Sequence, residues 1–469
     1  MSSVFSVDGG AAANTWLHIG LGSFHRAHQA VYLQQLHEAG DRHWSLVGGN
    51  LRNDMADTMA ALIAQQGQYT LETVASNGDR RYQRIQAIRE VIPFDPALSR
   101  LIDVGAQADT RIISFTVTEA GYYLDARNRL DDSHADVAAD LAGQGIATIY
   151  GSMRAILLER LRQGGAPVTL LNCDNLRSNG ERFRAGLLDF LTQRGDDALV
   201  DWVLDRTTCP NGMVDRITPR PLPDVAQRVQ AVTGWADAAP VMGEQFIQWV
   251  IEDRFAAGRP DWERVGVEMV ASVHAHEEAK IRVLNATHSC IAWAGTLRGL
   301  QTIHDSLAVP PIRQMAFDYV THDVIPCLNT PTPGSIDLAR YRDVVLDRFS
   351  NPHLRDTNQR VAMDGYSKIP GFIVPTLREC LAAGRSLAAT ALLPALFFEV
   401  LKRWHQGRLP FNYQDGVMDP AAAHALFDTA DPLDAFCRDG LLWGPLAGDP
   451  GLGTAIRAAH RGVLQFISE

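Results

Sequence analysis

The chain has 469 residues, a formal net charge of −11 at pH 7 and a hydrophobic fraction of 46%. This length predicts about two or three domains with ample core. The acidic balance argues against a protein that grips a nucleic-acid backbone or lies on an anionic membrane. The six cysteines lie far apart without a CxxC pair, which is unlike a disulfide scaffold or a zinc knuckle. The first residues lack a signal-peptide pattern and no apolar run reaches the roughly 20 residues of a membrane span. We therefore expect a soluble, cytoplasmic protein with no membrane or nucleic-acid partner.

The first expected element is a strand over residues 16–21, which leads into a Gly20-Leu21-Gly22 turn and a helix over 29–38. Glycines at such a turn let a pyrophosphate approach backbone amides at a helix N-terminus. The match to the GxGxxG pattern is incomplete, because His25 occupies the position of the third glycine. A dinucleotide-binding turn is favoured, and an ordinary tight turn is the alternative.

A second strand is expected over 45–49, followed by a helix over 55–65. Asp54 lies between them, where an acidic residue binds the adenosine ribose of NAD. Arg52 could instead meet the additional phosphate of NADP. We favour NAD as the cofactor.

Strands continue to alternate with helices up to about residue 172, which predicts a mostly parallel sheet with ligands at the carboxyl ends of its strands. Two polar clusters follow such ends, Thr118-Glu119 and Asp174-Asn175, although helix caps and turns use the same residue types. The remaining expected elements of this part are strands over 69–74, 110–117 and 167–172 and helices over 136–141 and 150–161.

The middle of the chain contains a proline-rich stretch, residues 209–221, which we expect to be an irregular connection that carries Asp215 toward a substrate. Residues 240–253 have a mixed amphipathic pattern, and a last strand is expected over 265–273. The pattern is helical from there on. We therefore expect an α/β, Rossmann-type NAD-binding domain with a mostly parallel sheet over 1–272 and a mainly α-helical substrate and catalytic domain over 273–469.

A long buried helix is expected over 274–297. Glu277, Lys280, Asn285 and His288 fall within an arc of about 140° on it, at about 100° per residue. Such buried polar groups need partners, so a structural hydrogen-bond network is the alternative to a catalytic face.

The rest of the chain is expected to be helical, with a Pro/Gly break at 330–334. The expected helices span 312–324, 336–349, 386–406 and 422–427. An irregular segment over 358–371 carries Arg360 and Lys368, which could be solvated or could reach the hydroxyls of a substrate.

These residue types suit the oxidation of a secondary alcohol. A lysine can remove the hydroxyl proton if burial lowers its pKa toward neutrality. Neutral amides such as Asn285 and Asn175 can stabilise the charge that develops on oxygen, His288 can orient the hydroxyl, and Glu277 can pass the proton to water. A metal site is the rival, since His274, His276 and other ligand types are near, but no HExxH spacing occurs. We expect no metal.

Six motifs in order, from about residue 16 to past residue 415, make the chain resemble the polyol-specific long-chain dehydrogenases, the mannitol 2-dehydrogenase family. The motifs are HIGLGSFHRAHQA, TVTEAGYY, LNCDN, PNGMVDRITPRP, EEAKIRVLNATHSCIAWAG and RVAMDGYSKIPGF. The resemblance implies an NAD-dependent, metal-independent interconversion of a polyol and a ketose, with D-arabinitol and D-xylulose as the expected pair.

The resemblance also implies roles for individual residues. The family's K-x4-N-x2-H motif matches Lys280, Asn285 and His288, with the lysine as general base. The remaining implied residues are Asn175 as second oxyanion amide, Asp215, Arg360 and Lys368 as substrate contacts, Glu277 on the proton path, and Gly20, Leu21, Gly22, Ser23, Phe24, His25, Arg26, Asp54, Thr118 and Glu119 as cofactor contacts. Asn53 departs from the acidic residue that relatives often carry there, which bears on the preference for NAD.

Several alternatives remain open. Within the family, the chain could be a mannitol 2-dehydrogenase or a fructuronate-type reductase. Outside it, the candidates are a cofactor-binding sensor without turnover and a metal-dependent sugar isomerase. We expect a monomer or a small homo-oligomer.

Overall fold

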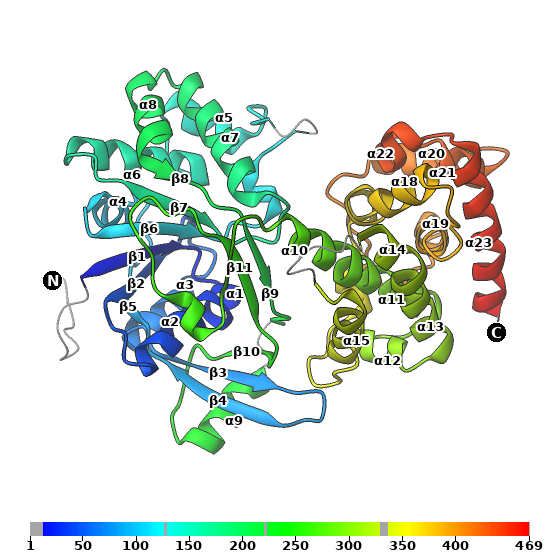
Figure 1. Cartoon of the computed structure of the whole chain (residues 1–469), viewed down its shortest axis with the longest axis horizontal. Coiled ribbons are helices and arrows are strands. Elements are labelled where there is room, and N and C mark those ends of the chain that lie inside the picture. Colours follow the sequence, from blue (N-terminus) through cyan, green and yellow to red (C-terminus); the bar gives the residue numbers. More distant parts are fainter. Residues whose placement is uncertain (1–12, 126–128, 220–222, 329–335, 469) are drawn as a thin grey trace. The chain divides into compact units, whose positions relative to one another are not determined.

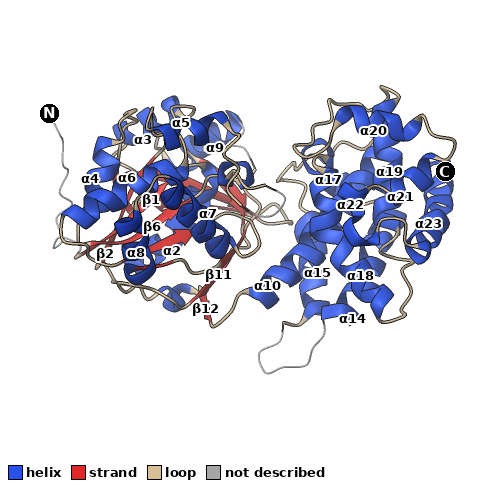
Figure 2. Cartoon of the chain, turned by 90° about the horizontal axis from the view of Figure 1, so that it is seen from above, coloured by secondary structure: helices blue, strands red, loops and turns tan. Residues whose placement is uncertain are grey.

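The computed structural model describes residues 13–125, 129–219, 223–328 and 336–468. The chain divides into two compact units. The first comprises the residues up to Ala75 and Asp79–His274, and the second comprises Ser76–Gly78 and the residues from Ala275 onward. In the described part of the chain, the first unit combines strands with helices, whereas the second is built of helices (Figures 1 and 2). The predicted fold class is confirmed. The break predicted at 330–334 lies outside the described residues.

The main sheet of the first unit has six strands in the order β5-β2-β1-β6-β7-β8, and every neighbouring pair is parallel. This is the strand order of a doubly wound dinucleotide-binding fold, in which the order reverses beside the first strand. The strands are β1 (Asn14–Ile19), β2 (Trp44–Gly49), β5 (Ile88–Val91), β6 (Thr110–Phe115), β7 (Val168–Asn172) and β8 (Thr207–Thr208).

Two three-stranded sheets complete the first unit, and they correct two expectations. The strand at 69–74 exists but pairs outside the parallel sheet. Residues 209–221 and 240–253 contribute short strands, so Asp215 ends a strand instead of lying in an irregular connection. Strands of four or five residues beside prolines are too short for their alternation to be recognised. The sheets are β10 (Val241–Glu244), β3 (Tyr69–Val74) and β4 (Arg80–Ile85), and β12 (Glu268–Val270), β11 (Gln248–Glu252) and β9 (Gly212–Asp215).

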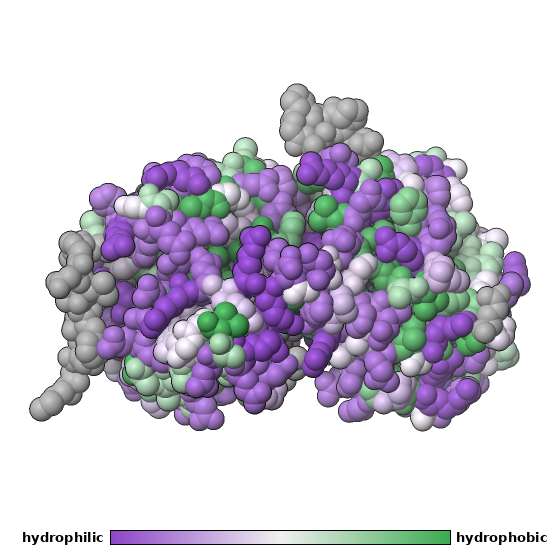
Figure 3. All heavy atoms as spheres, turned by 90° about the horizontal axis from the view of Figure 1, so that it is seen from below, coloured by the Kyte–Doolittle hydropathy of each residue, from purple (hydrophilic) through white to green (hydrophobic). Residues whose placement is uncertain are grey.

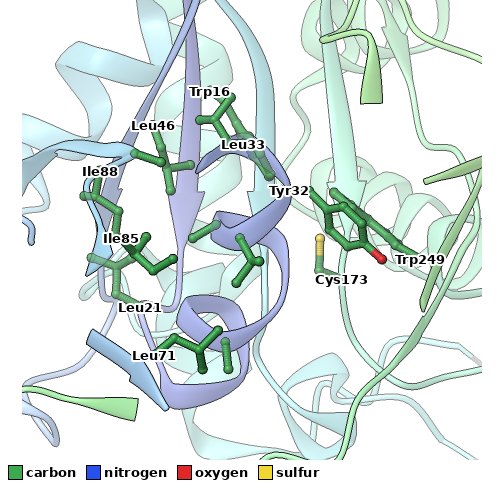
Figure 4. Close-up of a cluster of buried hydrophobic side chains, with 14 of the residues drawn as sticks. Trp16, Leu21, Tyr32, Leu33, Leu46, Leu71, Ile85, Ile88, Cys173 and Trp249 are labelled. Carbon is green, nitrogen blue, oxygen red and sulfur yellow. The ribbon is translucent and has the colours of Figure 1, made fainter. Parts of the chain in front are cut away.

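Helices pack on both faces of the main sheet (Figure 1). Alternate residues of β1 enter different cores, with Trp16 on one face and Leu17 on the other. Figure 4 shows Trp16 with Tyr32 and Leu33 of α2 and with Trp249 of β11. The helices are α1 (Ser23–Ala27), α2 (Gln29–Glu38), α3 (Ala56–Ala64), α4 (Ser99–Ala106), η1 (Glu119–Tyr122), α5 (Ala135–Ala142), α6 (Ile149–Arg162), α7 (Asn179–Gln193), α8 (Asp197–Arg206), α9 (Pro223–Thr233) and η2 (Trp262–Val265).

The second unit is organised around the predicted helix 274–297, which is continuous but not uniformly α-helical. It runs as α10 (His274–Ala279), the π-helical turn η3 (Lys280–Asn285) and α11 (Ala286–Leu297). Two further π-helical turns, η4 (Tyr319–Val324) and η5 (Ile369–Ile373), pack against η3. The assumed rotation of about 100° per residue therefore fails at its centre.

The segment 358–371, expected to be irregular, is also helical. It forms α16 (Asn358–Ala362), α17 (Gly365–Lys368) and the start of η5. Pieces of four or five residues carry too few apolar positions to show a helical period. The remaining helices are α12 (Ile303–Leu307), α13 (Pro310–Asp318), α14 (Ile325–Leu328), α15 (Leu338–Phe349), α18 (Val374–Ala382), α19 (Leu392–His405), α20 (Pro420–Phe427), α21 (Pro432–Cys437), α22 (Gly440–Trp443), η6 (Gly444–Leu446) and α23 (Pro450–Ser468).

Hydrophilic side chains cover most of the visible face of each unit, and hydrophobic ones are scattered among them (Figure 3). Among the helices in the described ranges, none has the length and apolar composition that a membrane crossing requires.

Candidate functional site

The turn after β1 is fixed by backbone geometry that requires glycine. Gly20 has a φ of +110°, and a Cβ at this position would fall on the carbonyl oxygen of Thr116. The Gly20 amide donates to the oxygen of Gly49 at 2.8 Å, and the Leu21 amide donates to Oδ1 of Asn50 at 2.7 Å. The turn is thus held against the carboxyl ends of β2 and β6, at the point where the strand order reverses.

The short helix α1 begins directly after this turn. Within the described residues the amides of Ser23 and Phe24 have no acceptor, and both residues are partly exposed. Backbone N–H groups in this arrangement suit an anion such as a pyrophosphate. The side chains of His25 and Arg26, by contrast, are buried: His25 stacks on His18 with ring centroids 3.4 Å apart, and Arg26 donates to a backbone carbonyl. These two residues can meet a cofactor only through their backbone.

The turn after β2 holds the residues expected to choose between NAD and NADP. Asp54 is exposed there. Arg52 donates through Nη2 to Oδ2 of Asp136 at 2.8 Å and to the hydroxyl of Tyr123 at 2.8 Å. The guanidinium that could bind an additional phosphate is therefore already paired with a carboxylate.

The polar clusters after β6 and β7 come together through Asp174. Its carboxylate accepts from the amides of Val117 and Thr118, each at 3.0 Å, and from the hydroxyl of Tyr122 at 2.9 Å. Burial raises the pKa of Asp174, and these donors oppose the rise. Thr118 has a φ of +64°, a strained value for a β-branched residue.

Asp174 therefore holds a strained turn in place, and Asn175 follows it on the exposed surface of the same unit. The expected contact through the side chain of Glu119 lies outside the described residues. Asp215 ends β9, is buried, and lies opposite Gln248 in the register of β9 with β11. Asn175 and Asp215 belong to the first unit, whereas the other expected catalytic and substrate residues belong to the second.

In the second unit, Lys280 and Asn285 stand at the two ends of η3. The backbone hydrogen bond of a π-helix joins residues i and i+5, so two residues with this spacing lie one above the other on nearly the same side. Lys280 and Glu277 are both buried, each 5% exposed. The π-helical turn thus aligns the lysine with the amide, and a regular α-helix would place them further apart around the axis.

Arg282 anchors this turn from the side. Its Nη1 and Nη2 each donate to a carboxylate oxygen of Glu379 in α18 at 2.7 Å, and its Nε donates to Glu278 at 2.7 Å. Arg282 holds the pKa of Glu379 below its ordinary value. A bidentate arginine–carboxylate pair fixes geometry as well as charge, so η3 is tied rigidly to α18.

His288, Arg360 and Lys368 are brought together around Asp356. Nε2 of His288 lies 3.1 Å from Oδ2 of Asp356, and Nε and Nη2 of Arg360 each donate to the same carboxylate at 2.7 Å. Burial lowers the pKa of His288, Asp356 opposes this, and the charges of Arg360 and Lys368 add to the lowering. The ring of His288 also stacks on Phe349, with centroids 4.3 Å apart.

Lys368 lies in α17 and donates through Nζ to the carbonyl of Val361 at 2.6 Å. Burial lowers its pKa to about 8, although Asp364 acts in the opposite direction. This amine therefore changes its charge near the working range of many enzymes.

The sequence indicated Asp174 only as part of a polar cluster and gave no signal for Asp356, Arg282 or Glu379. The residues that contact them are distant along the chain or lie on helices too short to show an apolar period. Among the described residues, no three histidine, cysteine, aspartate or glutamate side chains are grouped so that they could hold a metal ion. The expectation of a metal-independent reaction remains a prediction.

Two family models cover most of the chain. The mannitol dehydrogenase Rossmann domain matches residues 14–264, and the mannitol dehydrogenase C-terminal domain matches residues 272–458. The chain is 58% identical to D-arabinitol 4-dehydrogenase of Ralstonia nicotianae over 453 residues, 96% of each chain. It is 55% identical to D-arabinitol 4-dehydrogenase of Klebsiella pneumoniae over 433 residues, 92% of this chain and 94% of the other. It also resembles the structure of Pseudomonas fluorescens mannitol 2-dehydrogenase in ternary complex with NAD and D-mannitol, with a TM-score of 0.85, 33% identity and coverage of 97% and 94% of the two chains.

Proposed function

This chain is a polyol dehydrogenase that belongs to the mannitol dehydrogenase family, and we propose that it oxidises D-arabinitol to D-xylulose with NAD. The observation that carries the choice of substrate is the 58% identity to a D-arabinitol 4-dehydrogenase over 96% of each chain. The family-level prediction from the sequence motifs is confirmed by both family models. Membership of an enzyme family argues against a sensor without turnover.

NAD is proposed as the cofactor because the first unit offers what a dinucleotide needs. The turn is fixed by the packing of Gly20 against Thr116, and the amides of Ser23 and Phe24, which face no acceptor in the described residues, suit a pyrophosphate. Arg52 is paired with Asp136, which leaves Asp54 as the acidic group for a ribose. Leu21, Gly22, His25 and Arg26 would contribute backbone, with Thr118 and Glu119 at the end of β6. When bound, NAD supplies the acceptor for the hydride.

Lys280 is proposed as the general base that removes the proton of the reacting hydroxyl. Lys280 is buried, and a low-dielectric setting disfavours the charged form of a lysine, which is what a basic amine needs. Glu277, one turn earlier on the same helix, would pass the proton to water. This assignment makes 273–469 the catalytic domain and 1–272 the cofactor domain.

Asn285 and Asn175 are proposed to donate hydrogen bonds to the oxygen as it gains negative charge. Preorganised neutral donors stabilise such charge without titrating. His288, held by Asp356, would orient the hydroxyl. Because η3 aligns Lys280 with Asn285, the base and one donor can address the same oxygen.

Asp215, Arg360 and Lys368 are proposed to bind the other hydroxyls of the polyol. Arg360 uses Nε and Nη2 for Asp356, so Nη1 is the group we assign to the substrate.

All six cysteines are free, which supports our proposal of a reducing, cytoplasmic setting. We propose no nucleic-acid or membrane partner, and a monomer or small homo-oligomer.

The deciding experiment is a set of initial rates followed by the absorbance of the reduced cofactor. D-arabinitol and D-mannitol are assayed for oxidation with NAD and NADP, fructuronate is assayed for reduction with NADH, and each assay is run with and without a chelator. We expect D-arabinitol with NAD to give the highest kcat/KM, and the chelator to have no effect. A far higher kcat/KM for D-mannitol would overturn the choice of substrate. Activity that a chelator abolishes and one divalent ion restores would overturn the metal-independent mechanism.

Substitution of Lys280 tests the mechanism. The chain has only three lysines, Lys280, Lys368 and Lys402, so Lys402→Ala is a matched control in the same unit. We expect Lys280→Ala to lower kcat by at least about 10³-fold with NAD binding retained, and Lys402→Ala to stay near wild type. Equal rates for the two variants would exclude Lys280 as the base.

A further inference from the structure

Two cysteines of the second unit have their sulfur atoms in contact. Sγ of Cys327 in α14 lies 3.6 Å from Sγ of Cys380 in α18, and Nη2 of Arg385 donates to Sγ of Cys327 at 3.1 Å. Both residues are free thiols. Cys380 is buried, whereas Cys327 is partly exposed, so a small oxidant can reach one member of the pair.

This thiol pair is adjacent to the anchor of the π-helical turn η3. Cys380 directly follows Glu379, whose carboxylate holds Arg282 through two hydrogen bonds of 2.7 Å. Sγ of Cys327 also donates to the carbonyl oxygen of Thr376, one helical turn before Cys380 in α18, at 4.0 Å. Arg282 lies inside η3, two residues after Lys280. The sulfur pair is thus linked to η3 through Glu379 and Arg282, and Arg282 lies close to Lys280 in the chain.

We propose that Cys327 and Cys380 are a site of reversible disulfide formation by a peroxide, and that the disulfide lowers the dehydrogenase activity by disturbing the Glu379–Arg282 anchor. The effect on activity rests on the proposed role of Lys280, whereas disulfide formation itself does not.

The chemistry is a two-electron oxidation of the two thiols by one peroxide. The Cys327 thiolate attacks one oxygen, the O–O bond breaks, and the departing hydroxide takes up the proton that this thiol released, so the products are a sulfenic acid and one water. The sulfur of Cys380 then displaces the sulfenic oxygen, which leaves as a second water with the remaining thiol proton. The S–S bond forms between the two cysteines, and a dithiol reductant reverses it.

Formation of the Cys327–Cys380 disulfide would move atoms next to the Glu379–Arg282 anchor. A disulfide has an S–S length of about 2.0 Å, so the sulfurs must come closer than the present 3.6 Å. The thiol contact of Cys327 with the carbonyl oxygen of Thr376 in α18 is lost at the same time. Both changes fall on α18, whose Glu379 holds Arg282.

Oxidation of the Cys327–Cys380 pair by a peroxide should be slow at neutral pH. Burial raises the pKa of the Cys327 thiol to about 12, and Arg385 only partly opposes this. The reactive thiolate is therefore scarce, and oxidation should become faster as the pH rises.

The test treats the full-length protein with hydrogen peroxide and measures two outcomes, the Cys327–Cys380 link by non-reducing peptide mass spectrometry and the NAD-dependent oxidation of D-arabinitol. We expect the link to appear while activity falls at least about fivefold, and dithiothreitol to restore both. Cys327→Ser, with Cys327→Ala as a second variant, should keep its activity in peroxide. The control Cys437→Ser, which replaces a buried cysteine of the same unit, should respond like wild type.

Three results would overturn the proposal. Absence of the Cys327–Cys380 peptide after full treatment at alkaline pH would exclude the site. A formed link with unchanged activity would exclude the coupling to η3. Equal loss of activity in wild type and in both Cys327 variants would assign the damage to other residues. A protein that forms the link but never oxidises a polyol would refute the proposed function and leave the disulfide site established.

Discussion

The carboxylate of Asp356 lies 3.1 Å from Nε2 of His288 and simultaneously holds Arg360 through two hydrogen bonds of 2.7 Å. One acidic residue thus links an expected catalytic residue with an expected substrate contact. Burial alone raises the pKa of Asp356, but His288 and Arg360 bring it well below its ordinary value. The carboxylate therefore stays charged and fixes both partners.

Asp356→Asn should reduce catalysis without abolishing it. The amide keeps the shape but removes the charge that supports His288 and orients Arg360, so we expect kcat/KM for the polyol to fall about 10- to 100-fold, or about 1.4–2.7 kcal/mol of transition-state stabilisation. The measurement is steady-state kinetics with NAD at saturation.

Asp305→Asn is the matched control, because Asp305 lies 3.2 Å from His304 in the same unit but is half exposed. It should retain wild-type kinetics. If the two variants behave alike, Asp356 has no special role in positioning His288 and Arg360.

Asp174→Asn should weaken cofactor binding and stability together. The buried carboxylate receives three donors and holds the strained turn at Thr118, and an amide cannot accept all three equally well. We expect a loss of about 2 kcal/mol in the free energy of unfolding and a rise of about tenfold in KM for NAD. Urea unfolding and kinetics with varied NAD measure the two effects.

The control is Asp95→Asn, since Asp95 also accepts three hydrogen bonds, from Ala97 and Ser99, but on the exposed surface of the same unit. In Asp95→Asn we expect the free energy of unfolding and the KM for NAD to change little. A KM for NAD that stays at the wild-type value in Asp174→Asn would show that the Thr118 turn does not contribute to cofactor binding.

The sequence was sufficient for elements whose pattern is long or fully apolar. The buried strand β2 and helix α2 emerged at nearly their observed bounds, and the glycine turn between β1 and α1 was expected where it lies. The short strand β9 was missed because four residues beside a proline show no period. The π-helical turn η3 was also missed, since apolar spacing assumes the α-helical rotation.

The residues of the candidate site also fall into those that the sequence indicates and those that it does not. Lys280, Asn285 and His288 could be named as candidates because they share one helix and one motif, and their catalytic roles stay a prediction. Asp356 could not, because only tertiary packing brings its carboxylate from the neighbourhood of Arg360, four residues later in the chain, to His288 of α11. Contacts between distant segments leave no local signal in a single sequence.

Acid should destabilise the first unit through His18. Burial lowers the pKa of His18 to about 3, from an ordinary value of 6.5, so the unfolded chain binds a proton between these values that the folded chain does not. The stabilisation is complete above pH 6.5 and is lost as the pH falls toward 3. At pH 5 we expect a loss of about 2 kcal/mol from this residue, measured as the difference in urea unfolding between pH 7.5 and 5.

His18→Gln removes the titrating group, so its unfolding free energy should vary less between these pH values even if the variant is less stable at both. His43→Gln replaces an exposed histidine of the same unit and should keep the wild-type dependence on pH. An unchanged pH dependence in His18→Gln would assign the acid sensitivity to other groups.

The pairing of Arg52 with Asp136 should contribute to the choice of NAD over NADP. With the carboxylate in place, the Arg52 guanidinium is already partly neutralised, so it offers little to an additional phosphate. Asp136→Asn should therefore raise kcat/KM with NADP about three- to tenfold, which corresponds to about 0.6–1.4 kcal/mol, the upper range for an exposed ion pair. The effect should weaken at high salt because both side chains are largely solvated.

The matched experiment uses Arg52→Ala in the Asp136→Asn background. If the gained NADP activity comes from the released guanidinium, the second substitution removes it and leaves the rate with NAD nearly unchanged. If the gain persists without Arg52, the loss of the Asp136 charge alone explains it through reduced repulsion of the phosphate. A ratio of NADP to NAD rates that does not move in Asp136→Asn would show that this pair plays no part in the choice of cofactor, and Asp54 would then be the residue to substitute.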